Sequence, residues 1–293
     1  MVRMPLSHFA KDSDFPFFIQ YGFHDAGCYM HGHADFSELV VVTDGSAEHL
    51  VGEERYPIAK GDVFVINQYT EHGYSSTTNF KICNIMFQPE TMFAGIGNLR
   101  EAAGFQALFV LEPHYLQTNR FCSRLCLNAR EFDDIMQLIE QLMYEYTKRY
   151  EGWQTMIHAL FLRLCVRLSR DWQESDREIH KDIGKLAAAT AYMEKHFSED
   201  LRMEKLAEIA GYSVRQFTRL FRAAYAVTPM NYLVNLRMQK AMQLLKNTAL
   251  SVGEAAWRCG YEDQNYFSRI FRQYAGMTPS EYRSQNPAMP YST

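Results

Sequence analysis

An internal repeat in the last third of the chain restricts what this part can fold into. Three short motifs recur in the same order: a Gly-Tyr pair, a run with the pattern Phe-x-Arg-x-Phe-Arg, and a Thr-Pro pair. The copies are 49 residues apart at the glycines and 50 apart afterwards, so each copy is expected to form the same supersecondary unit. The first copies are Gly211-Tyr212, residues 217–222 and Thr228-Pro229, and the second copies are Gly260-Tyr261, residues 267–272 and Thr278-Pro279.

Each copy has the layout of a helix-turn-helix. A short apolar segment ends at Gly211 or Gly260, and glycine readily takes the left-handed conformation that ends a helix. Ser213 and Asp263 follow, and both side chains are suited to cap the start of a second helix. The repeat therefore predicts two helix-turn-helix motifs, with small residues such as Ala207 where the helices cross.

The second helix of each motif has an apolar face and a polar face. Residues three and four apart share one side of a helix, which places Phe217 and Phe221, and likewise Phe267 and Phe271, in a core. On the polar face, arginine suits guanine, glutamine and asparagine suit adenine, and hydroxyl groups and further arginines suit phosphate. We therefore expect double-stranded DNA as a partner. The predicted DNA-contacting residues are Arg215, Thr218, Arg219, Arg222, Gln264, Asn265, Ser268, Arg269 and Arg272.

Residues 229–246 lie between the copies and have the apolar spacing of one long helix. Eighteen residues at 1.5 Å each span about 27 Å. Successive major grooves on one face of a duplex are roughly 34 Å apart. A stiff helix of this length would let one chain read two neighbouring grooves.

Charge is divided unevenly along the chain. Residues 182–293 carry 14 Lys and Arg against 10 Asp and Glu, a net charge of +4, whereas the rest of the chain carries −8. A basic C-terminal part suits phosphate binding. With no apolar run that spans a bilayer and no signal sequence, we expect a cytoplasmic protein, associated with the nucleoid and without a membrane partner. Six scattered cysteines without a Cys-x-x-Cys pair indicate reduced thiols.

The N-terminal part is expected to be β-rich and is followed by a helical hairpin. Short strands are predicted at 15–21, 38–43, 48–51 and 62–67, with turns at Asp44-Gly45, Gly52-Glu53 and Lys60-Gly61, and we expect them to close into a barrel or sandwich. Apolar residues then recur at helical spacing in 132–146 and 156–168. This hairpin could cover the barrel or form the interface of a homodimer, and both alternatives remain open. The predicted domains are 1–130, 131–172, a linker at 173–181, and 182–285.

Three histidines and a carboxylate form a second group of interest. His31 and His33 would share one side of a strand, and Glu38 and His72 complete a donor set that suits a divalent transition metal. The same side chains could instead line a ligand cavity without any metal. A metal in the barrel is thus one alternative, and no cofactor is strictly required.

The region from about residue 182 to 283 resembles the DNA-binding domain of the AraC/XylS family of bacterial transcription regulators. The resemblance implies binding to DNA half-sites as a dimer and, usually, activation through RNA polymerase. It also implies base contacts by Arg215, Thr218, Arg219, Gln264, Asn265 and Ser268, with Arg269 near phosphate or base. The matching residues are Gly260-Tyr261, Asn265-Tyr266-Phe267, Arg269, Phe271, Gly276, Thr278-Pro279 and Tyr282-Arg283.

Residues 24–92 are similar to the sensor half of the L-rhamnose regulators of that family. The spacing of His31, His33, Glu38 and Gly45 resembles the first cupin motif, and residues 61–72 resemble the second, with Asn67 and Tyr69 in place of its Pro and Gly. The fold class implied is α+β multidomain, a cupin-like barrel and helical hairpin followed by an all-α double helix-turn-helix. A sugar-like effector is expected in the barrel. Its predicted polar contacts are His31, His33, Glu38, Arg55 and His72, with Tyr29 and Phe64 as an apolar wall.

Two other functions explain parts of the sequence. A metal-dependent cupin enzyme, such as a dioxygenase or isomerase, would use the histidines but leave the last 110 residues without a role. A constitutive DNA-binding protein would use its barrel only to dimerise. A ligand-responsive transcription factor accounts for the repeat, the uneven charge and the two-part layout together, so we expect a regulator, most simply an activator, and not an enzyme.

Overall fold

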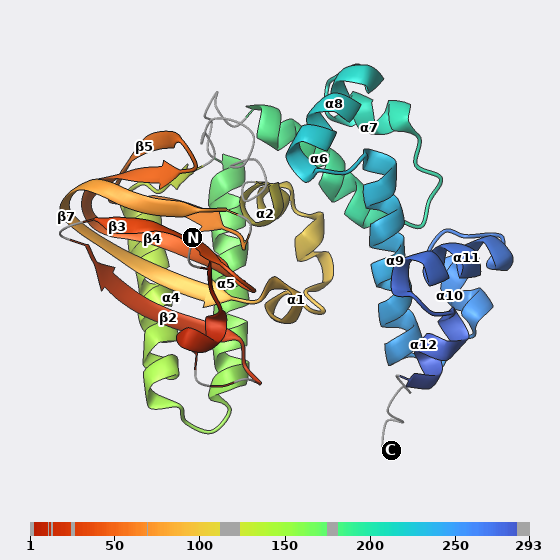
Figure 1. Cartoon of the computed structure of the whole chain (residues 1–293), viewed down its shortest axis with the longest axis horizontal. Coiled ribbons are helices and arrows are strands. Elements are labelled where there is room, and N and C mark those ends of the chain that lie inside the picture. Colours follow the sequence, from red (N-terminus) through yellow and green to blue (C-terminus); the bar gives the residue numbers. More distant parts are fainter. Residues whose placement is uncertain are drawn as a thin grey trace. The chain divides into compact units, whose positions relative to one another are not determined.

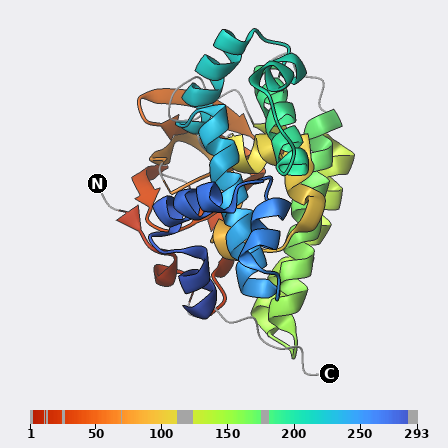
Figure 2. The same cartoon turned by 90° about the vertical axis from the view of Figure 1, so that its right-hand side faces the viewer.

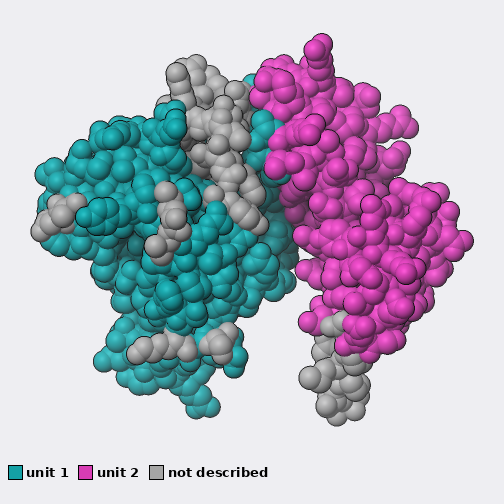
Figure 3. All heavy atoms as spheres, viewed as in Figure 1, with its two compact units in different colours: residues 1–188, 223–225 teal, residues 189–222, 226–293 magenta. Residues whose placement is uncertain are grey.

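The computed structural model describes residues 3–10, 12, 14–24, 27–68, 70–111, 124–174 and 181–285. They form two compact units, residues 1–188 with 223–225 and residues 189–222 with 226–293 (Figure 3). The first unit is β-rich with a helical hairpin and the second is helical, which confirms the predicted fold class (Figure 1). Tyr69 and most of the predicted linker, residues 175–180, lie outside the described residues. The predicted domain boundaries therefore stay a prediction.

The N-terminal unit is built on an eight-stranded sheet in the described part of the chain. Its path runs β1-β3-β7-β4-β6-β8, while β2 pairs with β7 and β5 pairs with β4. The two longest strands, β4 and β7, lie side by side and bring residues distant in sequence together. The strands are β1 (Arg3–Met4), β2 (Phe17–Phe23), β3 (Cys28–His33), β4 (Ser37–Val51), β5 (Glu54–Ala59), β6 (Asp62–Ile66), β7 (His72–Phe87) and β8 (Leu125–Cys126).

One predicted turn is wrong. Asp44-Gly45 lies inside β4, which runs without interruption and pairs with β7 through several register shifts. Gly45 has φ of 70°, and a Cβ there would lie 2.2 Å from the carbonyl oxygens of both Thr78 and Asn79. Glycine at this position therefore produces a bulge in a continuous strand, where the sequence pattern indicated a reversal. The turns at Gly52-Glu53 and Lys60-Gly61 are confirmed.

The helical hairpin packs on one face of this sheet. Helices α4 (Ala129–Lys148) and α5 (Trp153–Glu174) confirm the two predicted helices, and Asn128 begins α4 with a capping box. Phe161 of α5 is fully buried, with its ring 5.6 Å from that of Phe17 and 4.8 Å from that of Phe87. The apolar stripe thus serves as a cover for the sheet. The described part of the unit also contains five short helices: η1 (Leu6–His8), α1 (Pro89–Met92), η2 (Gly97–Glu101), α2 (Ala103–Phe105) and η3 (Gln106–Leu111).

The C-terminal unit is organised around one long helix, α9 (Pro229–Asn247) (Figure 2). The Tyr232 ring on α9 lies 5.7 Å from that of Phe221, and Met238 and Leu245 further along α9 join the core of the second motif. Both helix-turn-helix motifs therefore pack on the same rod, as predicted. No described helix is long and apolar enough to cross a membrane. The other helices of this unit are α7 (Met203–Ile209), α8 (Val214–Tyr225), α10 (Val252–Arg258), α11 (Gln264–Ala275) and α12 (Pro279–Gln285). Helix α6 (Lys181–His196) begins in the first unit and ends in the second, and residues 223–225 at the end of α8 are grouped with the first unit.

Candidate nucleic-acid interface and barrel pocket

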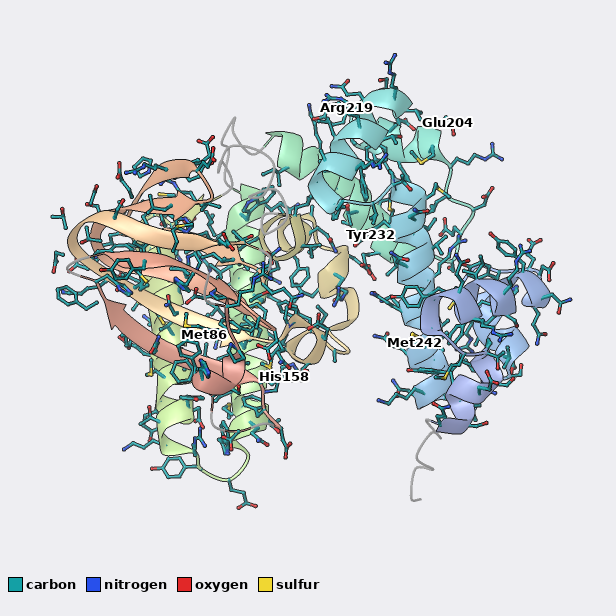
Figure 4. The ribbon with its side chains drawn as sticks, in the orientation of Figure 1. Met86, His158, Glu204, Arg219, Tyr232 and Met242 are labelled. Atoms are coloured by element: carbon teal, nitrogen blue, oxygen red, sulfur yellow. The ribbon has the colours of Figure 1, made fainter. Side chains whose placement is uncertain are left out.

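The first helix-turn-helix consists of α7 and α8. Gly211 takes φ of 64° between them, and the Ser213 hydroxyl accepts a hydrogen bond from the Gln216 amide at 3.3 Å. Phe217 and Phe221 are fully buried, as the helical spacing predicts. The polar side of α8 consequently faces away from the core of its motif, and Arg219 projects from its outer side (Figure 4).

The second motif, α10 and α11, repeats this construction. Gly260 has φ of 79°, and a Cβ there would lie 2.6 Å from the Ser198 carbonyl oxygen, so this turn depends on glycine. The Asp263 carboxylate accepts hydrogen bonds from the Asn265 and Tyr266 amides at 2.7 and 3.1 Å and caps α11. Phe267 and Phe271 are fully buried.

All nine predicted DNA-contacting residues lie outside the two cores. The five arginines, Gln264 and Asn265 are exposed, while Thr218 and Ser268 are half-buried. Among the described residues, no acidic side chain forms an ion pair with these arginines, so their charge remains available for phosphate or guanine. The predicted residues are Arg215, Thr218, Arg219 and Arg222 on α8, and Gln264, Asn265, Ser268, Arg269 and Arg272 on α11.

Three of these side chains have local contacts that hold them in place. The Thr218 hydroxyl donates to the Val214 carbonyl at 2.8 Å, and the Arg269 guanidinium lies over the Tyr266 ring at 5.2 Å. The Gln264 amide lies beside the first turn of α10, because its Oε1 would be 3.1 Å from a Cβ at Gly253. Arg269 and Gln264 are thus partly preorganised on the outer surface.

A cavity of about 470 Å³ opens into the barrel of the N-terminal unit. The structure brings four of the five predicted effector residues to it, namely His31, His33, Glu38 and His72. Arg55 is not among them, because it lies on β5 with a 67% exposed side chain and pairs with Glu48 at 3.6 Å. Of the predicted apolar wall, Tyr29 lines the cavity and is 95% exposed, whereas Phe64 belongs to the barrel core.

The inner polar group of the cavity is held away from water. His33, Glu38 and His72 are all buried, and burial raises the pKa of Glu38 to about 8. Burial, together with the neighbouring His31, lowers the pKa of His33 to about 3, and burial with the adjacent histidines holds the pKa of His72 well below its usual value. Both imidazoles are therefore neutral at physiological pH and present nitrogen lone pairs as well as N–H groups.

Sequence reasoning missed several polar residues of the cavity. Gln20, Tyr74 and Asn84 line it with the histidines, and His24 lies in the same wall. Tyr74 and Asn84 share β7 with His72 and stand at even spacings from it, so they fall on the same face of the strand. That alternation could have identified Tyr74, two residues from His72, whereas the left-handed residues Ser76 and Asn79 interrupt it before Asn84. In the described part of the chain, four buried polar atoms of the cavity lack a hydrogen-bond partner: His33 Nδ1, His72 Nδ1, Tyr74 Oη and Asn84 Oδ1.

Two family models match this chain. An AraC-like ligand binding domain matches residues 17–152, and a helix-turn-helix domain matches residues 206–285. The HTH-type transcriptional activator RhaR of Klebsiella pneumoniae subsp. pneumoniae is 32% identical over 266 residues, covering 88% of this chain and 88% of that protein. The chain belongs to the AraC family of transcription regulators. This AraC-family protein therefore binds DNA and carries a ligand-binding domain, as the sequence predicted.

Other relatives of this AraC-family protein align with most of its length. RhaR of Mannheimia succiniciproducens is 29% identical and covers 87% of each chain, and RhaS of Escherichia coli O139:H28 is 27% identical and covers 86% of each. Both are named HTH-type transcriptional activators, and relatives of this span leave no support for the enzyme alternative. Among solved structures, the DNA-binding domain of AdpA with a target DNA matches 34% of this chain and 91% of that one at 34% identity, with a TM-score of 0.34 that is too low to add to the assignment.

Proposed function

We propose that this protein activates transcription in response to a small sugar-like molecule that binds in the barrel cavity. The observation that supports the effector is the set of buried polar atoms without protein partners, which lie around an apolar cavity of about 470 Å³. Small-molecule sites combine such apolar walls with a few placed polar groups. The resemblance to the L-rhamnose regulators points to the same class of ligand.

The effector would act by shifting an equilibrium between two arrangements of the chain. A ligand can favour one arrangement only by binding it more tightly than the other. In the proposed mechanism, the sugar-bound arrangement is the one that binds the DNA site in the way that activates transcription. RNA polymerase is the proposed partner on that DNA.

Sugar binding is tested by the melting temperature of the purified chain. A sugar that binds the native state more tightly than the unfolded state raises the melting temperature, by an amount that grows with sugar concentration. We expect L-rhamnose or a related sugar to raise the melting temperature of the wild-type chain. Asn84→Leu should abolish most of this rise, because it removes a cavity amide, whereas Arg55→Ala should keep it, since Arg55 lies outside the cavity. A broad sugar panel without any shift would instead favour a constitutive DNA-binding protein.

Base reading is tested by substitutions on the two outer helices. Arg215→Ala and Gln264→Ala should each cost about 1–3 kcal/mol of binding free energy on the selected site and relax base preference at one half of it. Arg272→Ala should weaken binding to all sequences alike and lower the salt dependence, because it is assigned to phosphate. The site is first selected from a random DNA pool, and affinities are then measured on selected and random duplexes. Equal losses on both duplexes for Arg215→Ala would show that its assigned role is wrong.

We further propose that the hairpin forms a homodimer through its outer face. Tyr144, Tyr150 and Met156 are about half exposed there, although large apolar side chains are normally buried. In this proposal the functional parts keep the predicted limits, with the sensor barrel at 1–130, the hairpin at 131–172 and the DNA-binding domain at 182–285. Sedimentation of the wild-type chain and of Met156→Glu distinguishes dimer from monomer. A monomeric wild-type chain at micromolar concentration would contradict the dimer.

A further inference from the structure

The turns of the two helix-turn-helix motifs differ in their surroundings, although the repeat makes them equivalent. Gly211 and Gly260 both take the left-handed conformation, with φ of 64° and 79°. Among the described residues, a Cβ at Gly211 would meet no neighbouring heavy atom within 4 Å, whereas a Cβ at Gly260 would lie 2.6 Å from the Ser198 carbonyl oxygen. The second turn therefore packs closely against a segment from elsewhere in the sequence.

That segment is the connection between α6 and α7, residues 197–202, which leads into the first motif (Figure 1). Phe197 at the start of the connection packs against the core of the second motif, and the Lys240 ammonium group of α9 lies 5.6 Å from the centre of its ring. Leu201 near the end of the connection is buried. The connection thus contacts the second motif directly, in addition to the covalent link that α9 provides between the motifs.

Arg237 of α9 binds this connection. Its Nε donates to the Phe197 carbonyl oxygen at 2.7 Å, and its Nη2 donates to the Glu199 carbonyl oxygen at 2.7 Å. Hydrogen bonds from a charged donor are roughly twice as strong as neutral ones. The same guanidinium lies 5.4 Å from the centre of the ring of Tyr261, the residue directly after Gly260. One side chain therefore contacts both the connection and the second turn.

This lateral contact affects how firmly the two motifs are held relative to each other. A long helix that joins two motifs can bend along its length. Arg237 contacts the segment that leads into the first motif and the turn of the second motif, beside the axis of α9. A second contact of this kind restricts the bending of the helix, because bending would have to break the two charged hydrogen bonds.

We propose that Arg237 is a positioning residue for DNA recognition. By binding the connection next to the second turn, Arg237 fixes the orientation of α11 relative to α8, and so determines the separation of the two half-sites that one chain accepts. This role requires no contact between Arg237 and DNA. It rests on the proposed reading of two neighbouring grooves by one chain. A recognition surface that is ordered before binding loses less entropy when it binds, which favours both affinity and selectivity.

The test measures how strictly the full-length chain requires one spacing in its DNA site. Arg215→Ala and Gln264→Ala locate the two halves of the selected site, since each relaxes base preference in one half. One base pair is then inserted between the halves, which moves one half by about 3.4 Å and rotates it by about 35° relative to the other. The wild-type chain should bind this duplex at least about tenfold more weakly, because one recognition helix loses base contacts.

Arg237→Met should reduce this spacing penalty to less than about threefold, because α11 can change its orientation once the connection is released. Affinity for the original duplex should fall by about tenfold, since the orientation must then be fixed during binding. Arg258→Met is the matched control. Arg258 is exposed and lines the same surface pocket as Arg237, so its replacement removes the same charge, whereas the hydrogen bonds to the connection come from Arg237. The control should keep the wild-type spacing penalty.

The outcomes separate the role of Arg237 from the reading of two grooves. A wild-type spacing penalty in Arg237→Met, or equal relaxation in Arg258→Met, would overturn the positioning role while two-groove binding stands. If the melting curve shows that Arg237→Met does not fold, Arg237→Lys decides, because lysine keeps the charge but lacks the two fixed donors of a guanidinium. A wild-type penalty in Arg237→Lys would then overturn the role. A wild-type chain that binds both duplexes equally would overturn two-groove reading and, with it, the role of Arg237.

Discussion

Phe267→Ala is expected to remove about 3–5 kcal/mol from the stability of the C-terminal unit, the cost of emptying a large core position. Phe267 is fully buried, and its ring lies 5.4 Å from that of Tyr261 and 5.7 Å from that of Phe271. A domain has only about 5–15 kcal/mol of stability in total. The second motif should therefore open locally, and binding to the selected DNA should lose the contacts of α11 while those of α8 remain.

Hydrogen exchange measured by segment distinguishes this local effect from general damage. Amides of α10, α11 and α12 should exchange faster in Phe267→Ala, while amides of β4 and β7 keep their wild-type rates. Tyr274→Ala is the matched control, because Tyr274 is on the same helix but exposed, and its cost should stay within about 0.5 kcal/mol. Unchanged exchange in α10 and α11 would contradict the assigned core.

Gly104→Ala should destabilise the N-terminal unit by about 3 kcal/mol, although glycine to alanine in a helix normally stabilises by about 0.5–1 kcal/mol. A Cβ at Gly104 would lie 1.9 Å from the Ser169 carbonyl oxygen of α5. Backbone cannot move aside as a flexible side chain can, so α2 would have to shift away from α5. Phe105 would move with it, although it is fully buried with its ring 5.0 Å from that of Phe93.

The sign of this effect is checked against a second helical glycine. A Cβ at Gly184 would meet only the Trp172 ring at 3.5 Å, which is an ordinary contact. Gly184→Ala should therefore leave stability unchanged or raise it by up to about 1 kcal/mol. The free energy of unfolding of both variants is measured by chemical denaturation. Hydrogen exchange of the β4 and β7 amides then reports the stability of the N-terminal unit. If the two variants behaved alike, close helix packing at Gly104 would not be the cause.

The turns and buried faces of the two helix-turn-helix motifs could be predicted from sequence. Ser213, Asp263 and the two turn glycines mark helix ends through local chemistry, and the periodic phenylalanines identify the buried faces. The barrel was harder to predict, because the contacts that define it join segments that are distant in the sequence. Gly45 indicated a turn, yet whether glycine reverses a strand or bulges it depends on the neighbouring β7, which no local pattern reveals.

The candidate sites also differ in how far local sequence patterns predict them. Residues on one helix, such as Arg215 and Arg219, are placed by spacing alone. In the barrel, the motif spacing identified His31, His33, Glu38 and His72, but it could not exclude Arg55, which lies on β5 and pairs with Glu48 instead. Asn84 was missed because its approach to the histidines comes from strand pairing.

The continuous helix α9 also limits how this regulator can evolve. One residue inserted into an α-helix advances everything beyond it by 1.5 Å and rotates it by about 100°. If α8 and α11 enter neighbouring grooves as proposed, such a change would rotate α11 out of its own groove while α8 stayed in place. Small changes in the length of α9 would therefore disrupt the proposed binding. Operators recognised by descendants of this protein should consequently differ in base sequence but keep the same separation between their two contacted grooves.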